Sequence, residues 1–254
     1  MASVEKYTQA SVVGILRHNN REIVNNSNID IDPSLTYLNY ELTPEREMSH
    51  YQYFKKRKSE LYAYGRKDLK VLASWVVTAP KELESKEDID RFFEVTFDFL
   101  AQKYRIENVI QATVHFDEGK REKIRDRWTN EVIRDEFGKP VTELVKGRPH
   151  LHFSFIPSAP DNNSKHVQKE KICANDVLTR KHLKTFHGEL QEYLDKRGVK
   201  ASVITGITKE KGRNMTVDEL KERYMMEKEL AELREFKRIY EHNYSYENER
   251  NRWS

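Results

Sequence analysis

The chain has a single cysteine, Cys173, among 254 residues, which excludes a disulfide within one chain and fits a reducing compartment. No apolar run is long enough to cross a membrane. The N-terminal residues, which include Glu5 and Lys6, lack the apolar core of a signal peptide. Repeats, low-complexity tracts and a glycine-rich phosphate loop are also absent. We therefore expect a soluble, cytoplasmic protein without a membrane segment.

Neither positive nor negative charge is in large excess. Asp, Glu, Lys and Arg make up 34% of the residues, yet the formal net charge is only +3 and the pI is about 8.7. This balance neither proves nor opposes a nucleic-acid partner. The length has room for one domain of ordinary size and an appendage.

Hydrophobic patterns predict both strands and helices. Strands are expected at residues 11–16, 36–42, 71–78, 109–114, 153–156 and 199–204. Helices are expected after Thr43-Pro44-Glu45, after Ser85, over 175–196, and from Thr216 to about His242. Because strands and helices do not alternate regularly, we predict an α+β fold with a mostly antiparallel sheet covered by helices. A long C-terminal helix would follow it.

Three histidines follow or begin predicted strands. His115 follows the strand 109–114, and His150 and His152 flank Leu151 at the start of another. Alternate side chains of a strand share a face, so His150 and His152 point the same way and Leu151 is buried behind them. A third imidazole from a neighbouring strand would complete an open metal site, which suits polarising a phosphate oxygen. The alternative is a pair of surface histidines that only form hydrogen bonds.

His18 follows an apolar run that predicts a strand, so we expect it at a strand end. Arg21, three residues later, would give it a phosphate-binding neighbour. Histidine can act as a covalent nucleophile. Taken alone, His18 would instead be a structural or solvated histidine.

Two other segments have both a structural and a DNA-binding interpretation. Residues 37–42, Tyr-Leu-Asn-Tyr-Glu-Leu, form either an amphipathic strand with a core of Leu38, Tyr40 and Leu42 or an aromatic edge that contacts DNA. The basic run at 55–58 is either a solvated helix face or a set of phosphate contacts.

Taken in order, these strings resemble the plasmid mobilisation relaxases of the Mob/Pre type, the MobV family of the HUH single-strand endonucleases. The matching strings are His18-Asn19-Asn20-Arg21, Leu38-Asn39-Tyr40-Glu41-Leu42, His115-Phe116-Asp117-Glu118 and Pro149-His150-Leu151-His152. The resemblance covers roughly residues 11 to 205. It implies an antiparallel-sheet enzyme that nicks one strand of plasmid or transposon DNA at an origin of transfer. The enzyme would join covalently to the 5′ phosphate and later reseal the ends.

The resemblance also implies roles for individual residues. His115, His150 and His152 would hold one divalent ion, Mn²⁺ or Mg²⁺. His18 matches the nucleophile, Arg21 the arginine beside it, and Glu118 the acidic residue that assists. Tyr37 and Tyr40 are the alternative nucleophiles. Contacts to single-stranded or supercoiled origin DNA are expected from Arg17, Arg21, Asn39, Tyr40, Lys55 and Lys56.

One segment departs from the family pattern. Relatives have only a few residues between the two histidine strings, whereas here Gly119 to Arg148 intervene, with nine Lys/Arg against six Asp/Glu. The turn chemistry of 134–140 predicts a hairpin, which would leave the two histidine strands adjacent. This insert would either grip DNA beyond the nick or decorate the sheet edge.

The expected organisation is a nicking domain at 1–212, with its insert at 119–148, and a helical extension at 213–254. The extension carries an apolar stripe that would pack on its own domain or bind a second copy or a transfer-complex protein. The stripe comprises Val217, Leu220, Tyr224, Leu230, Leu233, Phe236 and Tyr240. Two other functions remain open: a non-catalytic DNA-binding or replication-accessory protein, and a metal-dependent hydrolase of a small substrate.

Overall fold

A computed structural model describes residues 2–23, 30–127, 129–204, 222–223, 225–226 and 228–238. The chain divides into two units, Met1–Ile204 and Thr205–Ser254. The domain boundary expected at 212 lies outside the described residues. No helix in the described ranges combines the length and apolar character needed to cross a membrane.

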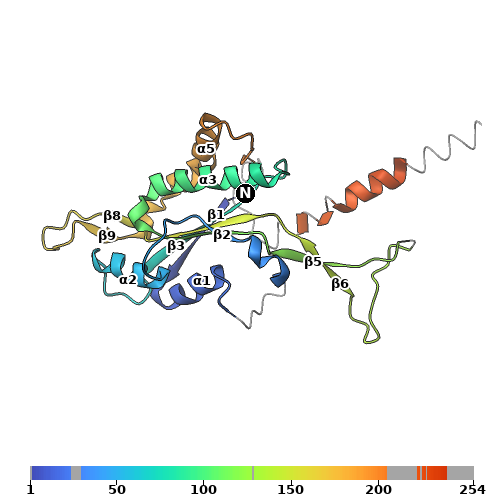
Figure 1. Cartoon of the computed structure of the whole chain (residues 1–254), viewed down its shortest axis with the longest axis horizontal. Helices are drawn as coiled ribbons and strands as arrows, with labels where there is room; N and C mark the ends of the chain where they lie inside the picture. The colour runs from blue at the N-terminus through green and yellow to red at the C-terminus, as the bar shows by residue number, and fades with distance from the viewer. Residues whose placement is uncertain are drawn as a thin grey trace, which may run out of the picture. The chain divides into compact units, whose positions relative to one another are not determined.

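The first unit is built on a five-stranded sheet with the order β1-β3-β7-β4-β2, in which every neighbouring pair is antiparallel (Figure 1). Its strands are β1 (Ala2–Thr8), β2 (Tyr40–Glu41), β3 (Lys70–Thr78), β4 (Val109–His115) and β7 (His150–Phe155). The central strand β7 lies between β3 and β4. The predicted α+β fold with an antiparallel sheet is therefore confirmed.

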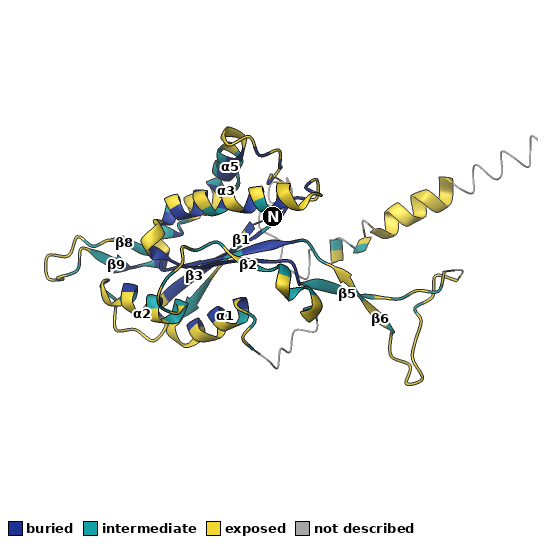
Figure 2. Cartoon of the chain, viewed as in Figure 1, coloured by how far each residue is buried: buried dark blue, intermediate teal, exposed yellow. Residues whose placement is uncertain are grey.

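Helices cover both faces of the sheet (Figure 1). The helices are α1 (Val12–Asn19), α2 (His50–Ser59), α3 (Lys86–Tyr104), α4 (Ala174–Val177) and α5 (Arg180–Lys196), with 3-10 helices at Gln9–Ser11, Pro33–Leu38 and Ile106–Asn108. Helices α3 and α5 lie on one face, where Trp75 stacks on Phe186 at 3.8 Å and donates a hydrogen bond to the Tyr104 hydroxyl at 2.9 Å. This face holds the larger core, which appears dark blue in Figure 2.

The opposite face, toward α1 and α2, is apolar at one end and polar at the other. Its smaller core joins Leu72, Ile110 and Ile156 to Val12, Leu16 and Phe54 of the two helices. At the other end β7 presents His150 and His152, while Leu151 between them is fully buried on the α3 side. The strand alternation predicted from the sequence therefore separates the histidines from the main core.

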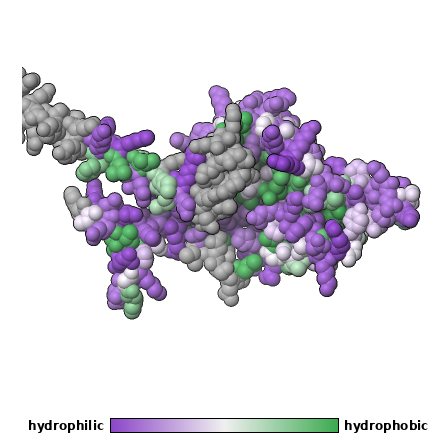
Figure 3. Space-filling model, turned by 180° about the vertical axis from the view of Figure 1, so that it is seen from behind, coloured by the Kyte–Doolittle hydropathy of each residue, from purple (hydrophilic) through white to green (hydrophobic). Residues whose placement is uncertain are grey.

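Two short ladders extend from the sheet. Strands β8 (Ser158–Pro160) and β9 (Glu170–Ile172) form one, and β5 (Gly119–Lys123) and β6 (Thr142–Lys146) form the other. We call residues 119–147 the arm. It projects from the end of the sheet where β4 ends and β7 begins (Figure 1), and an Arg134–Pro140 bridge marks its turn. Figure 3 shows that most of the surface seen from behind is hydrophilic.

The predicted strand at 11–16 is wrong, because this segment forms the helix α1. The buried side chains Val12, Leu16 and Asn19 are spaced by four and three residues, which is helical spacing. A six-residue apolar run does not distinguish a strand from a buried helix. His18 consequently lies in the last turn of a helix and not at a strand end.

The predicted strand at 36–42 is largely wrong as well. Residues Pro33–Leu38 form a 3-10 helix, in which Asp32 accepts a hydrogen bond from the Ser34 amide at 3.0 Å, and only Tyr40–Glu41 is strand. The helix expected after Thr43-Pro44-Glu45 begins later, at His50, because Ser49 and Gln52 form a capping box.

Two predictions near the end of the first unit also need correction. The strand expected at 199–204 does not form; instead the Val203 amide donates to Gln191 of α5 at 2.9 Å. The helix expected over 175–196 is two helices, α4 and α5, with Thr179 as the N-cap of the second. The helix α5 ends where expected, because Gly198 follows it with a φ of +72°, a conformation that favours glycine after a helix.

The predicted start of α3 is confirmed, because Ser85 accepts a hydrogen bond from the Asp88 amide at 3.1 Å. The second unit contains a helix at 228–238, on which Leu230, Leu233 and Phe236 are exposed. The other stripe residues, Val217, Leu220, Tyr224 and Tyr240, lie outside the described residues.

Candidate metal centre

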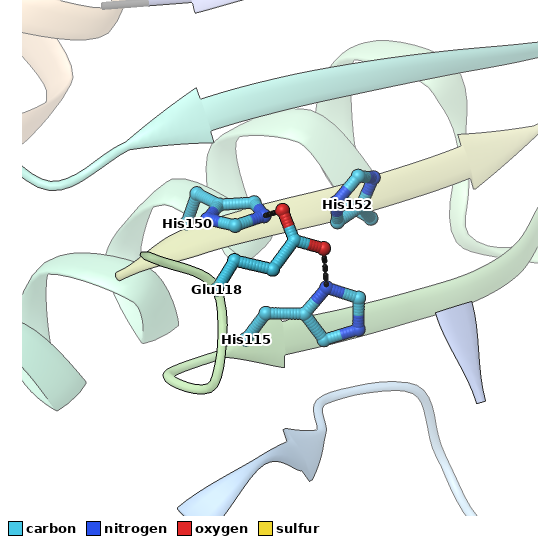
Figure 4. A group of neighbouring side chains, drawn as sticks. All are labelled: His115, Glu118, His150 and His152. Atoms are coloured by element: carbon cyan, nitrogen blue, oxygen red, sulfur yellow. Dashed lines mark ion pairs between the residues drawn. The ribbon is translucent and has the colours of Figure 1, made fainter. Parts of the chain in front are cut away.

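The sheet brings the three predicted histidines together on one face. His115 pairs with His150 in the β4–β7 register, and His152 lies two residues farther along β7. Their ring centroids are 4.8 to 5.5 Å apart. Figure 4 shows the three imidazoles around the Glu118 carboxylate, and one donor atom from each of the four residues lies within 4.8 Å of the others.

Backbone carbonyls orient two of the rings. His115 Nε2 lies 2.8 Å from the Asn19 carbonyl of α1, and His150 Nδ1 lies 3.3 Å from the Arg148 carbonyl. Because a carbonyl only accepts, each of these nitrogens carries the proton. His115 Nδ1 and His150 Nε2 are the nitrogens that face the Glu118 carboxylate. Such fixing of the tautomer by an outer hydrogen bond is common for metal-binding histidines.

Two of the ring nitrogens are buried without a hydrogen-bond partner. His115 Nδ1 and His152 Nε2 form no hydrogen bond, although leaving a buried polar atom unpaired is costly. Burial, followed by the charges of His150 and His115, holds the pKa of His152 well below its ordinary value, so this ring is neutral. Neutral imidazole nitrogens and one carboxylate are suitable donors for a first-row divalent cation. The residues therefore fit a metal ion.

Glu118 adds a fourth donor to the predicted three. Its two carboxylate oxygens lie 3.6 Å from His115 Nδ1 and 3.3 Å from His150 Nε2. Burial alone would raise the pKa of Glu118, but its contacts with His115, His150 and Arg21 lower it far more. Glu118 is therefore ionised. The sequence indicated a role in assisting the nucleophile, whereas its position also makes it a possible ligand.

Arg21 fixes the acidic pair beside the histidines. Its Nε and Nη2 donate to the two oxygens of Asp117 at 2.9 and 2.6 Å, and Nη2 also donates to Glu118 at 2.7 Å. The side chain of Asp117 is fully buried, and it accepts a further hydrogen bond from Thr36 at 2.9 Å. Burial would raise the pKa of Asp117, but Arg21 overcomes it and lowers the pKa. Arg21 is thus paired with both carboxylates of Asp117 and Glu118.

His18 lies beside this centre. It is half-buried in the last turn of α1, directly before Asn19, whose carbonyl fixes His115. Burial and the charge of Arg21 lower the pKa of His18, although Glu118 partly offsets them. The structure therefore holds a neutral imidazole within electrostatic reach of Glu118 and His115.

The other predicted DNA contacts fall into two groups. Arg17, Lys55 and Lys56 are exposed, on α1 and α2. The second group is Asn39 alone, whose side-chain oxygen is engaged within the protein, where it accepts a hydrogen bond from the Phe116 amide at 2.7 Å. Arg57, of the same basic run as Lys55, is buried and pairs with acidic side chains.

The two alternative nucleophiles are placed differently. Tyr40 donates its hydroxyl to Asp90 of α3 at 2.8 Å, and burial together with Asp90 raises its pKa. It packs with the core on the α3 side, away from the histidines, so this position does not support it as a nucleophile or DNA contact. Tyr37 is 80% exposed.

The sequence did not reveal a buried amide pair beneath the centre. Asn19 donates to Gln111 at 3.1 Å, and Gln111 donates to the Leu16 carbonyl at 3.2 Å, which attaches α1 to β4. Gln111 is fully buried. A glutamine within the apolar run Val109-Ile110-Gln111-Ala112 was the available signal, because a buried amide needs specific partners.

An antiparallel sheet with three histidines and a carboxylate on one face, and a fourth histidine on an adjoining helix, defines a metal-centre protein of the HUH type. The profile of the Mob_Pre family, described as plasmid recombination enzyme, matches residues 1–222, so the chain belongs to that family. The resemblance seen in the sequence is therefore confirmed.

Curated relatives share this name. The chain is 26% identical over 239 residues to a plasmid recombination enzyme of Streptococcus agalactiae, covering 91% of this chain and 40% of the relative. It is 28% identical over 192 residues to plasmid recombination enzyme type 1 of Staphylococcus aureus, and this match covers 73% of this chain and 39% of the relative. The chain thus spans about 40% of the length of these relatives.

A solved structure shares the fold. The manganese-bound MobM relaxase domain in complex with pMV158 oriT DNA superposes with a TM-score of 0.61 at 25% identity, covering 87% of this chain and 98% of that one. The relaxase-like fold predicted from the sequence is confirmed by this likeness.

Proposed function

We propose that this protein is a metal-dependent, site-specific single-strand DNA endonuclease and strand transferase, a relaxase that nicks origin-of-transfer DNA of a mobile element. One observation carries the proposal: His115, His150, His152 and Glu118 bring one donor atom each within 4.8 Å of the others, two of the ring nitrogens lack a hydrogen bond, and His18 with its lowered pKa lies beside them. Membership of the plasmid recombination enzymes and the likeness to the MobM domain support it.

The proposed cofactor is one Mn²⁺ or Mg²⁺ ion held by His115, His150 and His152, with Glu118 as a further donor. When bound, this ion would neutralise charge on the non-bridging oxygens of the scissile phosphate. The manganese in the MobM domain and the donor set described above support this choice.

His18 is the proposed nucleophile. One of its ring nitrogens attacks phosphorus, a P–N bond to the 5′ phosphate forms, and the P–O3′ bond breaks. The 3′ oxygen leaves and takes up, through solvent, the proton that the other ring nitrogen of His18 gives up, so the protons balance, and the ionised Glu118 assists by stabilising the transient positive charge on His18. The P–N bond conserves the energy needed to reverse these steps and reseal the strand.

Arg21 is the proposed positioning residue, because its ion pairs hold Asp117 and Glu118 in place. Arg17, Lys55 and Lys56 are exposed cations that we assign to the DNA backbone. A cytoplasmic location follows from a substrate that is intracellular DNA. We assign nicking to residues 1–212, since both core clusters lie at or before Val203.

We also propose a partner-binding role for the helical extension, either toward a second copy or toward another transfer-complex protein. The exposed Leu230, Leu233 and Phe236 on one helix support this proposal.

A covalent-adduct assay tests the function. The protein is incubated with Mn²⁺ and the supercoiled or single-stranded origin region of its own element, and the products are separated on a denaturing gel. We expect a protein–DNA adduct that His18→Ala abolishes and Tyr37→Phe retains, with mass spectrometry locating the link at His18. Binding without any adduct would indicate a non-catalytic DNA-binding protein, and hydrolysis of small phosphodiesters alone would indicate a small-substrate hydrolase.

A further inference from the structure

The arm exposes cations at alternate positions. Arg121, Lys123 and Arg125 are exposed along β5 and its continuation, and Arg127 is exposed in the turn beyond, whereas Glu122, Ile124 and Asp126 between them are half-buried. Alternate residues of an extended strand share one face, with about 6.6 Å between successive members. We call Lys123, Arg125 and Arg127 the basic stripe; Arg121 continues it toward Glu118.

The stripe is not a ladder of cross-strand ion pairs. Lys123 lies opposite Thr142, and Arg125 lies opposite Val132. No carboxylate within the described part of the arm pairs with a stripe cation, although Arg125 also donates to the Asn130 carbonyl at 3.0 Å. Charge compensation occurs on the other face instead, where Lys120 and Glu122 lie 3.7 Å apart. Cations on one face without opposite partners are suited to an external anion.

The base of the arm is attached to the metal centre. The Gly147 amide donates to the Glu118 carbonyl at 3.1 Å, and Glu118 also forms a bridge with Ile31. A Cβ on Gly147 would lie 2.4 Å from the Glu118 carbonyl oxygen, and one on Gly119 would lie 2.6 Å from the Val145 carbonyl oxygen. Because the two strands meet so closely at this point, the arm has a defined starting position next to Glu118.

We propose that the basic stripe is a second DNA-binding surface, which contacts the phosphate backbone of the substrate on one side of the scissile phosphate. The inference rests on the relaxase function proposed above. At about 3.3 Å per residue, Lys123 lies roughly 17 Å and Arg125 roughly 23 Å along the strand from Glu118, and Arg127 follows in the turn beyond. A single bound strand that leaves the metal centre along the arm therefore meets successive cations at a spacing close to that of its phosphates.

The stripe would bind without reading sequence. The stripe itself consists of three cations, so its own contacts are to phosphates, and their strength depends on salt. The logarithm of the binding constant falls linearly with the logarithm of the salt concentration. Loss of three phosphate contacts to a single strand makes this slope shallower by about 2. The wild-type protein should therefore lose roughly 20-fold more of its affinity than a stripe variant between about 50 and 200 mM salt.

The test compares two matched variants of the full chain. In the stripe variant, Lys123, Arg125 and Arg127 are replaced by Gln. In the control variant, the same number of exposed cations is removed from α5, through Lys181→Gln, Lys184→Gln and Lys196→Gln. Fluorescence anisotropy with labelled oligo(dT) of about 30 nucleotides, oligo(dT) of about 6 nucleotides and a duplex of about 30 base pairs measures affinity against salt.

We expect the stripe variant to bind the long probe more weakly, with the reduced salt slope, and to bind the short probe like the wild type. An effect on oligo(dT) alone assigns the arm to a single-stranded flank, and an effect on the duplex assigns it to a paired one. Equal affinities and slopes for the stripe and control variants on every long probe would overturn the proposal.

Adduct formation with saturating origin DNA separates this proposal from the function on which it rests. The stripe variant should still form the adduct at that concentration, since its substitutions lie outside the metal centre. If the wild-type protein forms no adduct, the relaxase function fails, and the anisotropy results alone still decide whether the stripe binds DNA.

Discussion

A nitrogen nucleophile must be neutral and near the phosphate, and the proposed nucleophile His18 lies beside the candidate metal centre with a lowered pKa. Burial and Arg21 place its pKa below the ordinary 6.5. The rate of adduct formation should therefore rise with pH through a midpoint below about 6.5 and be flat above it. The measurement is the initial adduct rate from about pH 4.5 to pH 8, with Mn²⁺ binding measured at each pH because the ligands also titrate. A midpoint above the ordinary value would contradict the assigned environment.

Replacement of His150 by Ala should weaken Mn²⁺ binding by more than the 10- to 100-fold that loss of an outer-sphere partner costs, since His150 supplies a donor directly. Titration calorimetry measures this affinity, and adduct formation should fall with it. His182→Ala is the matched control, because His182 is exposed on α5. Unchanged Mn²⁺ affinity in His150→Ala would remove this residue from the centre.

Arg21 offers a test through stability. Arg21→Ala leaves the buried Asp117 without its partner, so we expect about 3 to 5 kcal/mol of destabilisation at neutral pH. The lowered pKa of Asp117 means that its contribution is present above the unfolded-state pKa and is lost as pH falls. The difference between wild type and variant should therefore narrow near and below about pH 4. Urea unfolding at each pH measures this difference in the free energy of unfolding. The control is Arg17→Ala at an exposed position, which we expect to change stability by less than about 0.5 kcal/mol.

At this scale the sequence revealed side chains but not their backbone partners. The grouping of His115, His150 and His152 was predicted because residue type and strand alternation are visible in the sequence, whereas Glu118 as a fourth member of the group was not. The Asn19 carbonyl that orients His115 has no sequence signal, since every residue carries a carbonyl. The ion pairs of Arg21 had no sequence signal either, because its partners Asp117 and Glu118 are 96 and 97 residues away.

At the scale of elements, long patterns predicted structure better than short ones. The nineteen residues of α3 contain several turns of apolar spacing and an N-cap, and both were recognised. The eight residues of α1 contain only two turns, too few to separate helix from strand. The error mattered for the site, because a helix C-terminus places both His18 and the Asn19 carbonyl at the metal centre.

The base of the arm gives an element-scale prediction. Gly147→Ala would force a Cβ to within 2.4 Å of the Glu118 carbonyl oxygen, so the backbone beside Glu118 must shift. We expect about 1 to 3 kcal/mol of destabilisation and weaker Mn²⁺ binding. Gly188→Ala in α5, where a Cβ meets nothing within 4 Å, should instead stabilise by about 0.5 to 1 kcal/mol. Thermal unfolding and Mn²⁺ titration of both variants check this, and equal Mn²⁺ affinities would show that the arm base does not position Glu118.

At the scale of the whole molecule, the two units differ in what stabilises them. Both core clusters of the first unit consist of residues up to Val203. In the second unit the described helix leaves Leu230, Leu233 and Phe236 more than half exposed. The sequence predicted the helix from its apolar stripe, but it could not assign the stripe to the domain core or to a partner, because periodicity does not identify the surface that an apolar face covers.

Truncation before Thr216 tests this division. Because both core clusters of the described residues end by Val203, the shortened protein should stay folded, with a melting temperature within a few degrees of the wild type. It should also form the covalent adduct with origin DNA, because every proposed catalytic and metal-binding residue lies in the first unit.

If the apolar helix binds a second copy, light scattering should show a mass that falls to the monomer value on truncation. The full chain with Leu230, Leu233 and Phe236 replaced by Gln should lose the same association while keeping the helix. Failure of the truncated protein to fold would instead assign the extension to the catalytic domain.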